Sequence, residues 1–97
     1  MSYSFHPEAE AEFDRAIEYY EEREAGLGYD FVIEVYSAIE LAVTYPKAWT
    51  IIEGDLRRCL VHRFPYGILY AEEGEDLFIV AVMNLHKDPD YWKHRIG

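Results

Sequence analysis

Apolar residues recur every three or four positions in the first half of the chain, which is the period of an amphipathic helix. One stripe follows Pro7, a residue suited to the first position of a helix, and comprises Ala9, Phe13, Ala16, Ile17 and Tyr20. A second stripe ends before Pro46 and comprises Phe31, Val35, Ala38, Ile39 and Ala42. Gly26-Leu27-Gly28 interrupts the pattern, so we predict two antiparallel helices joined by a tight turn.

After Pro46 the pattern changes to the two-residue alternation of strands. The predicted strand segments are Ser2–His6 before the helices and, after them, Trp49–Ile52, a hairpin over Arg57–Tyr70, and Leu77–Leu85. The last segment is apolar on both faces, which is typical of a central strand that is covered on both sides. We predict one α+β domain over residues 1–97, in the order β-α-α-β-β-β, with the helical hairpin packed on one face of a small, mainly antiparallel sheet.

The hairpin is the most basic segment of the chain. Pro65 and Gly67 suit the second and fourth positions of a type I turn over Phe64–Gly67. Alternation would place one set of side chains on each face, Arg57, Cys59, Val61 and Arg63 on the first and Arg58, Leu60, His62 and Phe64 on the second. Three arginines and a histidine in an acidic chain predict contact with an anionic partner.

Charge limits the classes of function. The formal net charge is −10, and residues 1–50 hold three cations against eleven acids. The first helix carries most of these acids on an expected solvated face, namely Glu8, Glu10, Glu12, Asp14, Glu18, Glu21, Glu22 and Glu24. This balance argues against indiscriminate nucleic-acid binding, because Lys and Arg supply most of such affinity by neutralising phosphates.

Other classes are excluded by what the chain lacks. It shows no secretory signal, and its longest apolar run, Leu77–Met83, is far too short to span a bilayer, so we expect a cytoplasmic protein without membrane contact. Its single cysteine, Cys59, has no disulfide partner in the chain and is expected to be a small buried side chain. His86 and His94 lie too far apart to suggest zinc, and we expect neither a metal nor a cofactor.

Several features together carry a resemblance to a known family. They are the order of elements, the hairpin with Arg57-Arg58 and Arg63-Phe64-Pro65-Tyr66-Gly67-Ile68-Leu69-Tyr70, the apolar strand Phe78–Met83 and the closing Asp88-Pro89-Asp90-Tyr91-Trp92. Together they resemble the RelE/ParE superfamily of toxins from type II toxin–antitoxin, or plasmid stabilisation, modules. The resemblance implies a cognate antitoxin that wraps a segment over the toxin, and it allows a dimer or a toxin–antitoxin hetero-oligomer.

The resemblance also implies one of two targets. RelE-like members cut messenger RNA in the ribosome, whereas ParE-like members inhibit DNA gyrase and are not enzymes. Cleavage needs a base, an acid and cations that hold the scissile phosphate. The candidates here are Arg57, Arg58 and Arg63 for the phosphate, and His62, His86, Lys87 and Tyr91 for proton transfer.

The sequence departs from the ribonuclease pattern of that superfamily. Gly67 stands where an arginine commonly follows the hairpin tyrosine, and Asn84 where close relatives often carry a histidine. His86-Lys87 stands where two basic residues are frequent. These departures, together with the acidic first helix, favour a ParE-like toxin that binds a protein target such as gyrase. A ribosome-dependent nuclease, or a non-toxic relative that only binds an antitoxin, remains the alternative.

Partner contacts are expected on the hairpin and the tail, at Arg57, Arg58, Arg63, Tyr66, Tyr91 and Trp92. The antitoxin segment would carry apolar anchors and acids opposite the three arginines. Simpler alternatives stay open at both places. An arginine can be purely structural, paired with nearby acids, and the two tail aromatics can form a plug docked on the core instead of a contact surface.

Overall fold

The computed structural model describes residues 2–96 of the chain. The elements follow the order β1 (Tyr3–Phe5), α1 (Pro7–Arg23), α2 (Leu27–Thr44), β2 (Thr50–Glu53), β3 (Leu56–Leu60), β4 (Tyr66–Glu73), β5 (Asp76–Asn84) and the short 3-10 helix η1 (Lys93–Arg95). The predicted order is confirmed, with four strands instead of three after the helices because the hairpin itself supplies two. Neither α-helix has the length and apolar character needed to cross a bilayer.

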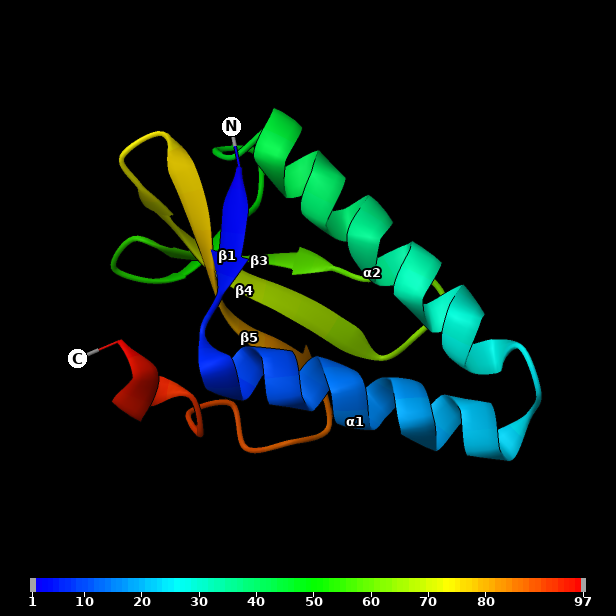
Figure 1. Ribbon diagram of the computed structural model, residues 1–97. Coiled ribbons are helices and arrows are strands. Elements are labelled where there is room, and N and C mark those ends of the chain that lie inside the picture. Colours follow the sequence, from blue (N-terminus) through cyan, green and yellow to red (C-terminus); the bar gives the residue numbers. More distant parts are fainter. Residues whose placement is uncertain (1, 97) are drawn as a thin grey trace.

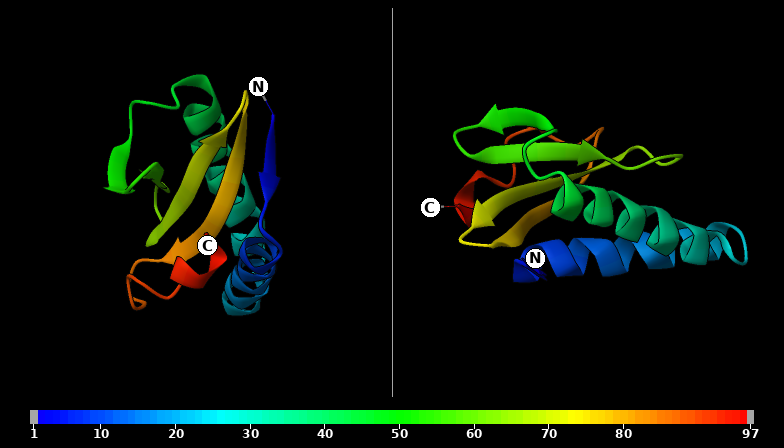
Figure 2. Two further views of the ribbon diagram at one scale, coloured as in Figure 1. Left: turned by 90° about the vertical axis from the view of Figure 1, so that its left-hand side faces the viewer. Right: turned by 90° about the horizontal axis from the view of Figure 1, so that it is seen from above.

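The strands form one sheet in the order β1-β5-β4-β3-β2. β1 pairs with β5 in parallel, and every other neighbouring pair is antiparallel. The apolar strand β5 therefore lies inside the sheet, as its sequence predicts. Both helices cover the same face, α1 mainly over β5 and α2 over β3 and β4 (Figure 1, Figure 2). The α+β architecture and the mainly antiparallel sheet are thus confirmed.

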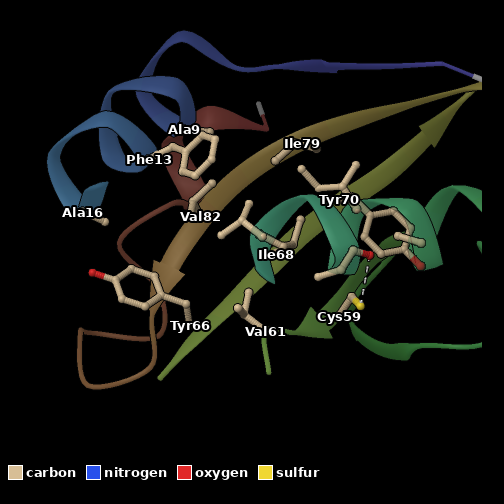
Figure 3. Close-up of a cluster of buried hydrophobic side chains, with 14 of the residues drawn as sticks. Ala9, Phe13, Ala16, Cys59, Val61, Tyr66, Ile68, Tyr70, Ile79 and Val82 are labelled. Atoms are coloured by element: carbon tan, nitrogen blue, oxygen red, sulfur yellow. Dashed lines mark hydrogen bonds between the residues drawn. The ribbon is translucent and has the colours of Figure 1, made fainter. Parts of the chain in front are cut away.

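The main core fills the space between the helices and the sheet. Val82 of the sheet lies next to Phe13 of α1, whereas Tyr70 lies at the other side of the cluster, near Cys59 (Figure 3). A second, smaller core lies on the outer face of the sheet, the face turned away from the helices. It contains Leu56, Leu69, Val80, Ala81, Met83 and Trp92. Both faces of β5 are covered, which explains its nearly continuous run of apolar residues.

The two helices approach closely at their turn. Gly26 has a left-handed φ of 89°, and Gly28 lies inside α2 instead of in the turn. A Cβ atom at Gly28 would lie 2.8 Å from the backbone oxygen of Ile17 in α1, so only glycine fits there. Glu21 of α1 fixes the turn, because its carboxylate accepts hydrogen bonds from the backbone N–H groups of Gly26 and Gly28 at 2.9 and 3.0 Å.

The predicted turn over Phe64–Gly67 is wrong. β3 ends at Leu60 and β4 begins at Tyr66, so residues 61–65 form the connection and Gly67 pairs with Leu60 inside the sheet. The chain reverses at Arg63, whose φ of 72° lies in the left-handed region. The N–H of Val61 then donates to the carbonyl of Tyr66 at 2.9 Å and closes the loop.

The predicted alternation of faces holds as far as Val61, which is buried with Cys59 in the main core, and fails in the loop that follows. Phe64 was assigned to the face of Arg58 and Leu60, but it is buried in the main core on the helix side. Its ring packs against Tyr20 and Phe31, with centroids 4.9 and 5.1 Å away. Burying this ring against two others stabilises the inward turn of the loop, because aromatic rings bury a large apolar area.

Candidate functional site

Arg58 is the predicted arginine that the structure places on the outer face. It pairs with Leu69 of β4, and its aliphatic stem lies over Gly67, where a Cβ atom would be 3.0 Å from Arg58 Cγ. Its Nε is buried without a hydrogen-bond partner in residues 2–96, and no carboxylate in that range forms an ion pair with it. A cationic group left in this state is suited to a carboxylate brought by another molecule.

Apolar side chains surround this arginine. Leu60, two residues after Arg58 in β3, is 55% exposed, and Leu85 is also exposed beside Gly67. Met83 pairs with Gly67 and is buried beneath them. We call Arg58, Leu60, Gly67, Met83 and Leu85 the Arg58 patch. A single cation in an apolar surface is an arrangement that fits a partner protein.

The other two arginines lie elsewhere. Arg57 projects from the opposite face of β3, and its Nη1 donates to the backbone carbonyls of Lys47 and Trp49 at 3.1 and 2.8 Å. It thereby ties the connection between α2 and β2 to the sheet, which is a structural role. Arg63 sits in the loop before β4, with Nη1 3.8 Å from a carboxylate oxygen of Asp30. The structure therefore does not gather the three arginines at one place.

The tail is held by a buried acid that the sequence pattern misassigned. Glu12 was expected on the solvated face of the first helix, but it is only 8% exposed. It accepts hydrogen bonds from Arg95 Nη1 at 2.8 Å, from the Val82 N–H at 3.1 Å, and from the Tyr91 hydroxyl. The position of Glu12 in the sequence could have indicated its burial, since residues 9, 12, 13 and 16 lie on one side of the helix.

The tail aromatics take the core alternative. Trp92 is 1% exposed and packs in the outer core with Leu56 and Leu69. Burial, followed by the hydrogen bond to Glu12, raises the pKa of the Tyr91 hydroxyl well above its ordinary value. This hydroxyl is therefore a poor proton donor or acceptor, because it stays protonated and is already engaged.

The remaining predicted residues do not converge on the Arg58 patch. His62 is 84% exposed in the loop, with Nδ1 3.7 Å from a carboxylate oxygen of Glu34. His86 is exposed in the turn after β5, where its backbone N–H donates to the Asn84 side-chain oxygen at 2.9 Å. The Lys87 ammonium lies 4.7 Å from the centroid of the Tyr91 ring. Tyr66 is buried on the helix side of β4.

The fold and the patch together define a class: a small α+β protein with a helical hairpin on one sheet face and a patch of one arginine among apolar side chains on the other. Residues 3–96 match the family model of the ParE toxin of the type II toxin-antitoxin system, parDE. The chain therefore belongs to the ParE toxin family, within the RelE/ParE superfamily that its sequence resembles.

One solved structure shows how well the fold is shared. It is described as the chromosomal ParDE TA system from P. aeruginosa, and it superposes with a TM-score of 0.73 over 89% of this chain and 97% of that chain. At 18% sequence identity, this likeness concerns the fold alone. No curated protein matches the chain significantly.

Proposed function

We propose that this ParE-family chain is a toxin that acts by binding a protein target such as DNA gyrase, and that a cognate antitoxin neutralises it. The observation that carries the proposal is the Arg58 patch, in which one unpaired guanidinium stands among exposed and buried apolar side chains. Such a surface favours association, since apolar contact supplies affinity and a buried charge pair supplies specificity.

The same surface is poorly equipped for RNA cleavage. A ribonuclease of this class needs several cations around the phosphate and a pair of proton-transfer groups. Gly67 offers no side chain, Arg57 is engaged by two carbonyls on the other face, and the Tyr91 hydroxyl is held by Glu12. These placements support the non-enzymatic mechanism over the RelE-like one.

The patch also indicates what an antitoxin would bring to it. Leu60 and Leu85 offer apolar contacts on either side of Arg58, and the guanidinium lacks a carboxylate. A complementary segment would place two apolar side chains around one Asp or Glu. Of the three arginines expected to meet antitoxin acids, Arg58 is the one whose surroundings best support that role.

The first experiment separates the two mechanisms. The protein is induced in bacteria without an antitoxin, and incorporation of labelled thymidine and labelled methionine is followed for the first minutes. Gyrase inhibition predicts that thymidine incorporation falls first, while a fall in methionine incorporation first would favour the ribonuclease. Unchanged growth despite a cooperatively folded product would instead support a non-toxic relative that only binds its antitoxin.

Variants connect the outcome to the patch. Arg58→Gln is expected to weaken growth inhibition and antitoxin binding, because it removes the unpaired charge and keeps the stem. Lys47→Gln is the matched control, since it makes the same change in net charge at an exposed residue paired with Glu72. His86→Gln is expected to leave toxicity intact. Loss of toxicity in that variant would contradict the non-enzymatic mechanism.

A further inference from the structure

A cleft of about 290 Å³ lies on the helix side of the molecule, apart from the Arg58 patch. α1 forms one wall with Arg15 and Tyr19, and the turn after β5 contributes Lys87. Tyr66 and Asn84, cross-strand partners at the end of the β4–β5 ladder, complete it. Figure 3 shows the Tyr66 ring at this end of the main core, near Ala16 of α1.

Within residues 2–96, the cations of this cleft have no ion-pair partner. Neither Arg15 nor Lys87 forms an ion pair with any carboxylate of residues 2–96, although acids outnumber bases 19 to 9 in the chain. Glu12 lines the cleft, but Arg95, Tyr91 and the Val82 N–H already use its carboxylate oxygens. The cleft thus presents two cations from different elements, neither of which forms an ion pair within residues 2–96.

The rest of the lining is suited to an apolar group that carries an anion. The lining includes the apolar residues Ala16 and Val82 and the aromatic residues Tyr19 and Tyr66. Asn84 adds an amide group. Donors, cations and apolar surface therefore meet in a space small enough for one or two side chains.

We propose that this cleft binds a peptide segment of a partner protein through a carboxylate seated between Arg15 and Lys87, with a neighbouring apolar side chain against Ala16 and Val82. Charge-assisted bonds from the two cations would hold the carboxylate. The surrounding surface argues against a long polyanion, because the exposed acids of α1 would repel successive phosphates. The site does not depend on toxicity or on which protein is the target.

The test uses capped peptides and the full chain labelled with nitrogen-15. N-acetyl-phenylalanine offers a terminal carboxylate, and N-acetyl-Asp-Phe-amide offers a side-chain carboxylate. Their uncharged controls are N-acetyl-phenylalaninamide and N-acetyl-Asn-Phe-amide. At least one carboxylate peptide is expected to shift the amide signals of Arg15, Ala16, Asn84 and Lys87, and to bind about tenfold more tightly than its uncharged control.

Substitutions locate the binding. Arg15→Gln and Lys87→Gln are each expected to weaken it about fivefold to tenfold, since each removes one charge-assisted contact. Lys47→Gln, which lies outside the cleft, is expected to change it less than about twofold, a bound set by screening between exposed charges. Both cleft residues are exposed, so the variants are expected to keep the wild-type pattern of amide signals elsewhere.

Three outcomes would overturn the proposal. The first is equal binding of the charged and uncharged peptides, and the second is a set of shifted signals outside the cleft. The third is inorganic phosphate binding as tightly as the carboxylate peptides, which would make the cleft a general anion site. Because the assay measures binding to the isolated chain, its failure is independent of any failure of the growth experiments.

Discussion

At the scale of single residues, the Glu12 carboxylate joins three separate parts of the chain. It lies on α1, accepts from the backbone of β5, and holds Tyr91 and Arg95 of the tail. A buried ion pair contributes little compared with well-packed apolar residues, but removing one partner leaves an unpaired buried charge. The cost of a substitution here therefore depends on which partner is left behind.

Arg95→Gln is expected to lower the free energy of unfolding by about 3–5 kcal/mol, because it leaves Glu12 without its cation. Urea denaturation of the purified protein measures this loss. Lys93→Gln serves as the control, since Lys93 pairs with Glu53 and Asp90 at the surface and should cost less than about 1 kcal/mol. The double variant Glu12→Gln with Arg95→Gln should be more stable than Arg95→Gln alone, and an equal or larger loss would contradict this account.

The buried thiol of Cys59 and the buried hydroxyl of Tyr70 predict how stability changes at alkaline pH. Burial raises the pKa of Cys59 from 9.0 to about 11 and that of Tyr70 from 10.0 to about 12. The folded protein keeps these protons while the unfolded chain loses them, so their contribution is complete below about pH 9 and is lost as the pH rises to about 12. Urea midpoints at successive pH values should fall throughout that range.

Cys59→Ala tests this assignment. The baseline stability should drop because a buried side chain is truncated, but the decline between pH 9 and 11 should become shallower than in the wild type. The maximum slope from one such group is about 1.4 kcal/mol per pH unit. An unchanged slope would show that Cys59 does not titrate differently in the folded and unfolded states.

At the scale of elements, the contact between the helices depends on Gly28. Gly28→Ala would place a methyl group against the backbone of Ile17 and the Cβ of Glu21, neither of which can move without shifting α1. We expect a net loss of about 1–2 kcal/mol, since overpacking outweighs the better helix propensity of alanine. Ser37→Ala, at an exposed position of the same helix, should be neutral or slightly stabilising in thermal unfolding. Equal effects of the two changes would contradict a tight crossing.

The sequence predicted most elements because their periodicity is decided locally. The helical stripes and the doubly apolar β5 are visible without knowledge of the fold. The connection after β3 could not be predicted in this way, since the inward turn of Phe64 depends on Tyr20 and Phe31 of the helices. The different places of Arg57 and Arg58 followed from alternation, but their roles depended on which carbonyls and side chains the fold brings near them.

The site was less predictable than the fold. Resemblance pointed to the family and to the arginines, yet the Arg58 patch includes Leu60 and Leu85, which no motif marks. The cleft on the helix side joins α1 to residues about 70 positions later, and no local pattern links them. Glu12 was the exception, because its place within the buried stripe could have identified it.

At the scale of the whole molecule, the net charge of −10 predicts a stability that depends on salt. Like charges on α1 repel one another in dilute buffer and are screened as ionic strength rises. Raising sodium chloride from 10 to 200 mM should increase the melting temperature by about 4 °C, equivalent to about 0.5–1 kcal/mol. A variant with Glu18→Gln and Glu22→Gln should show a smaller increase, and a fall in melting temperature would contradict this.

The parallel pairing of β1 with β5 has a consequence for synthesis. Ser2 and Asp76, which are hydrogen-bonded beside this pair, are 74 positions apart in the chain. At about 5–20 residues per second, β1 waits roughly 4–15 s for its partner to be translated. Until then the helical hairpin lacks the strand that α1 covers, and neither the patch nor the cleft can be complete. A growing chain therefore presents neither surface until β5 and the turn after it have been synthesised.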